Sequence, residues 1–573
     1  MKKAETQPVR AKFKHFPDRP KKLTAEFAKK LYDKLLARTI AAEAASAPDL
    51  WLKLFADWNE LGSYVSAEGS RINHAYSKNM ADKKLEAADE YFREKIIPAI
   101  NKPAHQMMDL FLKSRHRQAV AKRYGRQLIV IFEKVMKPFD PINTALRTKA
   151  SKLTKDYDKM VAGAMVTVQG QKMTLWQASD LLESPDESIR KEAYLATRGW
   201  VLDNRQKLAD IYDKLVKLRH QMAKKVGYKT YIPLGYESMG RTDYNEAMAA
   251  QFRKNVHKYA TPIIKELSKK QTQTLGKKIL RPWDMYDPQL SLPLGIVPVD
   301  GQIKTAKKMF DKLNPRFGKH FEFMVKNDLI DLENRPNKRS GAYCTEFTDQ
   351  GLVAILCNST GNADDVQTLT HEMGHAFQGW ESQHIEAVDL QWGTYDLAEV
   401  FSMGMEFLTL PYIEDFFSQE NAEKFRRGRW ERAVGILCYV CVVDEFQHWV
   451  YKNPRATKAQ RDEKWIELGD KYIGRNVDFS GYEKYQKTRW YLQGHIFSMP
   501  FYYIDYALAE TAAMQLGLRD LADHKKTMQV YLKLCRLGGT KSFLEALQTA
   551  GLVSPFDESL MRDLMDYARK VLI

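Results

Sequence analysis

The sequence has 573 residues, of which 44% are hydrophobic and 28% are charged, and its formal net charge is +17. A chain of this length exceeds one hydrophobic core, so we expect at least two lobes of an ordinary globular protein. No run of about 18 apolar residues occurs, so we do not expect a membrane-spanning protein.

The excess of positive charge raises the question of nucleic-acid binding. Beyond the N-terminus, basic residues alternate with acidic ones, as in "KKLEAADEYFREK". Such interleaving is typical of solvated helix faces, whereas a phosphate-binding surface clusters its cations, and no nucleic-acid motif accompanies the charge. We therefore expect no nucleic-acid partner, and a preference for acidic peptides stays open.

The N-terminus and the cysteines indicate an intracellular protein. Residues 1–22 are basic and lack the apolar stretch of a secretory signal, so we interpret them as a flexible arm. The cysteines are few, odd in number and scattered, which argues against a disulfide framework and favours the cytoplasm. They are Cys344, Cys357, Cys438, Cys441 and Cys535. The C-x-x-C pair Cys438 and Cys441 lies in an apolar run, so buried helical cysteines are expected there rather than a redox or zinc pair.

In chain order, the first half of the protein is predicted to be a succession of helices. From Leu23 to about Arg281, apolar residues recur at spacings of three and four. One exception is "AMVTVQGQKMTL", where alternation around Gly170 predicts a small hairpin. After it, Ser184 and Pro185 resemble a helix start.

The second half begins with a long connection and a second strand-rich region. Prolines and glycines in "LRPWDMYDPQLSLPLGIVPVDGQ" interrupt the helical periodicity. The segment "SGAYCTEFTDQGLVAILCNSTG" predicts two strands joined by a turn near Asp349 and Gly351. Helices follow to the end, with a break at Gly538 and Gly539. The chain is therefore expected to be mainly α, with an arm at 1–22, an N-terminal helical region at 23–195 and a further region at 196–573.

The stretch "LTHEMGHAFQGWES" carries the clearest chemical pattern. On a helix, His371 and His375 lie one turn apart on the same face, so both imidazoles can bind one metal ion. Glu372 lies beside them and can deprotonate a water that the metal activates. The pattern predicts a hydrolytic zinc site; a pair of exposed histidines on a surface helix is the alternative.

A catalytic zinc requires a third protein ligand and an open position. Glu399 lies 24 residues after His375, which leaves room for a loop and a second, antiparallel helix. On that helix Glu399, Met403 and Glu406 share a face, and a carboxylate on an apolar face needs a partner such as a metal. We prefer Glu399 to the rival ligands, His384 and Glu386, which lie in the expected loop.

Several longer segments resemble one known family. "HEMGHAFQ" followed by "DLAEVFSM", preceded by "LCNSTGNADDVQTLT" and followed by "GHIFSMPFYYIDYALA", looks like the M3 family of zinc oligopeptidases, nearest to its oligoendopeptidase F branch. The resemblance extends from about Leu153 to the C-terminus, and the first hundred residues share only a helical character with the family. It marks 196–573 as the catalytic region.

The resemblance implies a mainly α, two-lobed ellipsoid with a deep central channel, and a small β-hairpin or sheet beside the zinc-binding helix. By position, His371, His375 and Glu399 match the ligands of one Zn2+ per chain, and Glu372 matches the general base. These assignments make the protein a metalloendopeptidase of the cytoplasm.

The resemblance also covers the downstream segment. His495, Tyr503 and Tyr506 match family residues that contact the substrate and the developing oxyanion, and Tyr502 is a substitute for Tyr503 as a substrate contact. In the eukaryotic branch the spacing differs by one residue and a further tyrosine replaces Met499–Pro500. From the residues alone, an aromatic core stripe is the preferred interpretation of these tyrosines, although phenol donors can stabilise an oxyanion.

The strand pair before the zinc helix has a second possible role. Its edge at Gly341, Ala342 and Tyr343 can bind an extended peptide through backbone hydrogen bonds. A structural hairpin without a ligand is the alternative.

Together, these features predict a zinc-dependent endopeptidase that cleaves short unstructured peptides, with Glu372 as general base. One rival is a dipeptidyl carboxypeptidase of related layout, because the angiotensin-converting-enzyme family shares "HEMGH" and a glutamate at a similar distance. Another is a helical peptide-binding protein with a vestigial metal site. The sequence carries no indication of oligomeric state.

Overall fold

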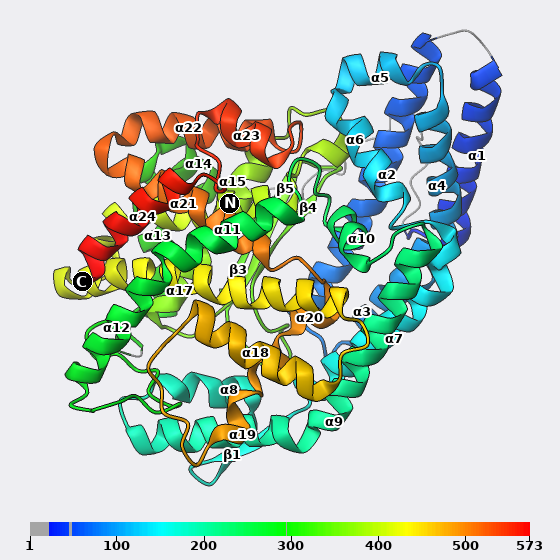
Figure 1. The fold of residues 1–573 in the computed structure, drawn as a ribbon. Coiled ribbons are helices and arrows are strands. Elements are labelled where there is room, and N and C mark those ends of the chain that lie inside the picture. The colour runs from blue at the N-terminus through cyan, green and yellow to red at the C-terminus, as the bar shows by residue number, and fades with distance from the viewer. Residues whose placement is uncertain (1–21, 45–47, 294) are drawn as a thin grey trace. The chain divides into compact units, whose positions relative to one another are not determined.

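The structure is a computed structural model that describes residues 22–44, 48–293 and 295–573. The basic arm expected at 1–22 lies outside the described residues, except for Lys22. The fold is mainly α, as expected, with small sheets (Figure 1). The chain forms two compact units, each assembled from three segments. Unit 1 comprises the described residues of 1–136, 293–419 and 516–552, and unit 2 comprises 137–292, 420–515 and 553–573.

Unit 1 begins with an antiparallel array of helices. Its N-terminal helices are α1 (Ala25–Ala44), α2 (Pro48–Lys78), α3 (Lys83–Tyr91), α4 (Ile97–Lys113), α5 (Arg117–Tyr124) and α6 (Arg126–Met136). Figure 1 shows α1, α2 and α4, in blue to cyan, side by side, and both α2 and α4 pack on α1. Leu35, Tyr64 and Ile100 are buried where these helices meet. Their apolar periodicity therefore produces a core.

The rest of unit 1 surrounds a three-stranded sheet. Its helices are α13 (Val299–Leu313), α14 (Pro315–Lys326), α15 (Ala363–Glu381), α16 (Tyr395–Thr409), α22 (His524–Leu537) and α23 (Phe543–Ala550). The strands are β3 (Ile330–Glu333), β4 (Tyr343–Phe347) and β5 (Leu352–Ser359), in the order β3-β5-β4. The predicted antiparallel pair is confirmed, with Tyr343 opposite Leu356 and Phe347 opposite Leu352. The parallel strand β3 was not predicted.

Unit 2 is built on helices of widely different length. They are α7 (Thr144–Ala162), α8 (Leu175–Asp180), α9 (Glu187–Lys225), α10 (Tyr231–Ser238), α11 (Glu246–Tyr259), α12 (Thr261–Thr274), α17 (Gln419–Lys452), α18 (Lys458–Tyr472), α19 (Glu483–Gln486), α20 (Gly494–Ser498) and α24 (Glu558–Leu572). Helix α21 (Ile504–Ala522) begins in unit 2 and ends in unit 1. Gln419, the first residue of α17, likewise belongs to unit 1.

Two local predictions in unit 2 have different outcomes. The hairpin is confirmed as β1 (Met165–Val168) and β2 (Gln171–Thr174), and Gly170 lies in its turn with φ of 72°. The helix start assigned to Ser184 and Pro185 is corrected, because α9 begins at Glu187 with Asp186 as its N-cap. The carboxylate of Asp186 accepts the Ser188 N–H at 2.7 Å, which a preceding proline cannot replace.

Helix α17 is the most apolar long helix of unit 2. It is long and apolar enough to cross a membrane by length and composition alone, and 72% of its most apolar stretch is buried inside the protein. The expectation that no segment meets this test is therefore corrected. Cys438 and Cys441 lie buried in this helix, as expected, and both are free thiols.

Candidate metal centre

The helix that carries the H-E-x-x-H pattern starts at a tightly bonded loop. Strand β5 ends at Ser359 and α15 starts at Ala363, so only a short turn separates them. Within that turn the carboxylate of Asp365 accepts the backbone N–H groups of Thr360, Gly361 and Asn362 at 2.9, 2.6 and 3.0 Å. The buried strand therefore fixes the position of α15.

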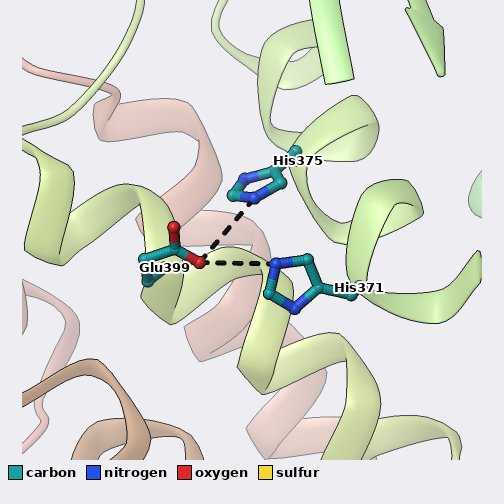
Figure 2. Close-up of side chains that lie close together, drawn as sticks. All are labelled: His371, His375 and Glu399. Atoms are coloured by element: carbon teal, nitrogen blue, oxygen red, sulfur yellow. Dashed lines mark ion pairs between the residues drawn. The ribbon is translucent and has the colours of Figure 1, made fainter. Parts of the chain in front are cut away.

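The structure brings the three candidate ligands together (Figure 2). His371 and His375 project from α15, and Glu399 projects from α16. Glu399 Oε2 lies 3.4 Å from His371 Nε2 and 3.9 Å from His375 Nε2, and the donor atoms all lie within 4.8 Å of one another. Tetrahedral zinc with bonds of about 2.0–2.2 Å needs donors about 3.4 Å apart, so the group fits zinc with little movement.

Gly374 allows α16 to approach closely the helix α15 that carries His371 and His375. A Cβ atom at Gly374 would lie 2.4 Å from the backbone oxygen of Phe401 and 2.7 Å from Cα of Ser402. The hydroxyl of Tyr531 on α22 also donates to the Phe401 oxygen at 2.8 Å, which holds α16 from its other side. Close contact between the helices thus places Glu399 beside the histidines. Sequence reasoning missed Gly374, although it lies inside the motif.

A second carboxylate, Glu406, orients His371. Its Oε1 lies 2.7 Å from His371 Nδ1, and its Oε2 accepts from Gln367 Nε2 at 2.7 Å. Because the carboxylate accepts, Nδ1 carries the proton and Nε2 presents its lone pair towards Glu399. His375 differs, since its buried Nδ1 has no hydrogen-bond partner among the described residues. The shared face of Glu399 and Glu406 was noticed in the sequence, but this role of Glu406 was not.

Glu372 is buried beside the cluster and keeps one oxygen available. It is 6% exposed, and its Oε2 has no hydrogen-bond partner in the described part of the chain. Burial raises the pKa of Glu372 to about 7, with Glu399 and Glu406 adding to that effect and His371 opposing it. A carboxyl group with a pKa near neutrality can both accept and return a proton.

The rival ligands lie elsewhere in unit 1. Glu386 forms an ion pair with Arg123 at 3.0 Å. His384 Nδ1 lies 3.0 Å from the backbone oxygen of Glu381. Neither belongs to the group of donors formed by His371, His375 and Glu399.

In unit 2 the downstream residues form one aromatic cluster. The ring of His495 lies 5.6, 5.1 and 6.0 Å from the rings of Tyr502, Tyr503 and Tyr506, respectively. The ring of Tyr506 also lies 5.1 Å from that of Tyr502 and 5.5 Å from that of Tyr503. Residues from α20, from the loop that follows it and from α21, which were predicted to act together, therefore lie close to one another.

The loop between α20 and α21 is strained and held by buried side chains. Phe501 has φ of 70°, which is rare for a residue with a side chain. Its N–H donates to Gln447 at 2.7 Å, and Arg241 donates to its carbonyl. Arg241 also pairs with Asp505 at 2.6 Å. These contacts fix the start of α21, where Tyr506 lies.

A chain of hydrogen bonds reaches His495 from Arg489 of the short helix η6 (Arg489–Leu492). Arg489 Nε donates to the Tyr439 hydroxyl at 3.2 Å, and that hydroxyl donates to Gln493 Oε1 at 2.7 Å. Gln493 Nε2 lies 3.2 Å from His495 Nδ1. A guanidinium can only donate, so each hydrogen bond of this series runs from Arg489 towards His495. His495 Nδ1 is therefore an acceptor. A neutral His495 therefore carries its proton on Nε2.

The predicted substrate segment lies at an edge of the sheet in unit 1. Gly341 and Ala342 precede β4, and Tyr343 is its first residue. Asn358 on β5 donates to the backbone oxygen of Gly341 at 2.7 Å, and the Tyr343 hydroxyl lies 3.1 Å from His74 Nδ1 on α2. β4 pairs with β5 on one side and is an outer strand of the sheet.

Two histidines and a glutamate on adjacent helices, with a buried glutamate between the histidines, define a metallopeptidase of the H-E-x-x-H type. The chain belongs to peptidase family M3, because residues 180–566 match Peptidase family M3 and residues 20–139 match the Peptidase M3 N-terminal domain. The second match corrects the expectation that the first hundred residues share only helical character with the family.

Relatives and solved structures agree with this membership. The chain is 22% identical to an oligoendopeptidase F homolog of Borreliella burgdorferi over 86% of its own length and 83% of the relative. It is 22% identical to Group B oligopeptidase PepB of Streptococcus agalactiae, over 69% of this chain and 66% of that protein.

Among structures, PZ peptidase A with an inhibitor matches at 32% identity and a TM-score of 0.89, over 97% of this chain and 98% of that one. A protein described as an oligoendopeptidase F from Bacillus anthracis matches at 30% identity and a TM-score of 0.84, over 98% of both chains. The protein is thus similar to metallo-oligopeptidases along most of its length.

Proposed function

We propose that the protein is a zinc-dependent endopeptidase that hydrolyses internal bonds of short unstructured peptides. The observation that supports this most is the His371, His375 and Glu399 cluster, with the buried and partly unpaired Glu372 beside it. Membership in a family of metallopeptidases supplies the reaction class, and its relatives are oligopeptidases by name.

In this proposal His371 Nε2, His375 Nε2 and a carboxylate oxygen of Glu399 hold one zinc ion. Zinc in such a site acts as a Lewis acid towards water and the scissile carbonyl. Glu406 keeps His371 in the tautomer that can bind metal, because it accepts the Nδ1 proton. Ser402 donates to Glu399 Oε2 at 3.0 Å, which orients that carboxylate.

Glu372 carries out the proton transfers. Its unpaired oxygen takes a proton from the attacking water and then delivers it to the leaving amine. The burial of Glu372 favours both proton transfers, because it raises the pKa of this carboxyl group to about 7, near the working pH of a cytoplasmic enzyme.

The aromatic cluster of unit 2 supplies donors for the oxyanion. His495 offers an Nε2–H because Gln493 occupies its Nδ1, and Tyr503 and Tyr506 offer hydroxyl groups. Tyr502 and the edge formed by Gly341, Ala342 and Tyr343 bind the substrate. Backbone pairing at such an edge tolerates many sequences, which suits an enzyme that degrades varied peptides.

The cytoplasm is the compartment that we propose, since the five cysteines are all free thiols. The function is tested by incubating purified protein of known zinc content with a mixed peptide pool and mapping the cuts by mass spectrometry. Internal cuts that disappear with a chelator and return with zinc are expected. Intact peptides at full zinc occupancy would contradict the proposal and favour a binding protein.

A further inference from the structure

Two arginines of unit 2 lie together in an environment of tyrosines. Arg198 on α9 is 9% exposed, and Arg489 on η6 is exposed. Helix α9 packs against η6. The Arg198 guanidinium lies 5.7 Å from the ring centre of Tyr194, and that of Arg489 lies 5.1 Å from the ring centre of Tyr439.

Neither guanidinium forms an ion pair with a carboxylate in the part of the chain that the structure describes. Besides burial, the groups that act on the pKa of Arg198 are Arg489, Tyr194 and Tyr439. Those that act on the pKa of Arg489 are tyrosines, with Tyr439 first, and they raise it.

Most other buried arginines of unit 2 do have carboxylate partners. These pairs are Arg190 with Asp284, Arg241 with Asp505, Arg253 with Asp444, Arg429 with Glu510 and Arg461 with Asp213. Arg219 instead donates to the Tyr451 hydroxyl and to the backbone oxygens of Ile496 and Phe497.

This arrangement is costly for the protein alone. A buried cation loses hydration, and a like charge nearby raises the cost further. Burial, together with the charge of Arg489, lowers the pKa of Arg198 to about 10. Because no carboxylate among the described residues pairs with the buried Arg198, an anionic ligand is the partner that would offset this cost.

The position of the pair indicates which ligand. The ring of Tyr439, beside Arg489, lies 5.8 Å from the ring of Tyr503, which lies 5.1 Å from that of His495. Arg489 also starts the hydrogen-bond chain that ends at His495. The arginines therefore adjoin the residues that the proposed function assigns to the peptide.

We propose that Arg198 and Arg489 form a subsite for a carboxylate of the peptide substrate. The inference rests on the proposed function. Two guanidinium groups present planar forks of N–H donors that match a carboxylate, and the burial of Arg198 limits competition from water at that group. The carboxylate comes either from the C-terminus of the peptide or from an aspartate or glutamate side chain.

The test uses one peptide that the enzyme cleaves, prepared in three forms. The first has a free C-terminus and one internal glutamate, the second is the C-terminal amide, and the third has glutamine in place of the glutamate. The wild type is compared with Arg198→Gln. Lys207→Gln, which removes the same charge from the exposed face of α9, is the matched control.

The wild type should lose about tenfold in kcat/KM on one of the two neutralised peptides, mainly through KM, because a charge-assisted hydrogen bond is lost. A loss with the amide identifies the C-terminal carboxylate, and a loss with the glutamine form identifies the side chain. Arg198→Gln should discriminate less than twofold, and Lys207→Gln should behave as the wild type. Equal rates on all three forms, or unchanged discrimination in Arg198→Gln, would overturn the inference.

Binding without turnover separates this inference from the proposed function. Fluorescently labelled versions of the three peptides are titrated into Glu372→Gln protein, with and without Arg198→Gln. A wild type that cleaves nothing counts against the proposed function, whereas peptides bound without regard to their charge count against the subsite.

Thermal melts distinguish a substrate subsite from a structural role for Arg198. Arg198→Gln should leave Tm unchanged or raise it, because an unpaired buried charge is removed. Arg253→Gln should lower Tm, because it leaves the buried Asp444 without its partner. If Arg198→Gln lowered Tm as much as Arg253→Gln does, Arg198 would be a structural residue and the subsite would be overturned.

Discussion

Glu406 illustrates how one side chain prepares another. It contacts His371 and Gln367 and is not among the three clustered donors. Replacing it by glutamine removes the charge that holds the Nδ1 proton, so His371 becomes a weaker ligand. We expect Glu406→Gln to lower zinc affinity by about 10–100-fold, measured by competition with a chromophoric chelator.

Glu381→Gln is the control for this change. Glu381 is a buried carboxylate at the end of α15, and it pairs with Arg536 at 2.9 Å and with Arg316 rather than with the candidate ligands. It should lower Tm and leave zinc affinity within a factor of two. Equal zinc affinities in Glu406→Gln and the wild type would show that His371 needs no such acceptor.

The Tyr439 hydroxyl sets the direction of the hydrogen bonds that end at His495. Tyr439→Phe keeps the ring and removes the link between Arg489 and Gln493. The Gln493 amide is then free to turn, and His495 loses its preferred tautomer. We expect kcat to fall about tenfold, as for the loss of one hydrogen bond of roughly 1.4 kcal/mol, with KM within twofold and Tm little changed. An unaltered kcat would show that His495 has no role in catalysis.

Part of this site was visible at the level of residues and part was not. His371, Glu372 and His375 follow from one helical turn, and Glu399 follows from the need for a third donor. The roles of Gly374 and Glu406 depend on how closely α15 and α16 approach each other. The spacing of residues in the sequence does not predict that distance. The pair Arg198 and Arg489 joins positions 291 residues apart, so only the fold reveals it.

Among the elements, the contact between α15 and α16 is the most sensitive. Gly374→Ala places a methyl group against the Phe401 and Ser402 backbone, which cannot rotate away. Overpacking of this kind costs about 1–3 kcal/mol of unfolding free energy. Because Glu399 moves with α16, zinc affinity should fall together with stability, as urea unfolding and chelator competition would measure.

Gly435→Ala is the matched change. Gly435 also lies inside a helix, α17, but a Cβ atom there meets nothing within 4 Å. It should raise the unfolding free energy by up to about 1 kcal/mol, because alanine is the better helix former, and leave the zinc site unaltered. Similar effects of the two substitutions would contradict the close helix contact.

The elements themselves were predictable where periodicity was strong. The helices and both antiparallel strand pairs follow from spacings of three to four and of two. Strand β3 was missed because "IDLE" is only four residues long and half acidic, so its pairing with β5 depends on tertiary contacts. Membership of 20–139 in the family was missed because helical periodicity alone, without a catalytic motif, does not distinguish one helical array from another.

At the scale of the molecule, the channel that the family resemblance implies would limit the size of the substrate. A concave site that admits an extended chain excludes a folded surface. Peptides of up to about 20 residues, a length taken from the family resemblance, should be cleaved, and stable globular proteins should remain intact at the same enzyme concentration. Efficient digestion of a native protein, followed by gel electrophoresis, would contradict a closed channel. The same protein after unfolding and fragmentation serves as the control.

The central claim, that three residues bind zinc and a fourth moves the proton, is tested most directly in one pair of variants. Zinc content and peptide turnover are measured on the same samples of Glu372→Gln and His375→Ala. Glu372→Gln should retain about one zinc per chain and lose most of its turnover, whereas His375→Ala should lose both, because it removes a ligand. Loss of zinc from Glu372→Gln, or full turnover in that variant, would contradict the assignment.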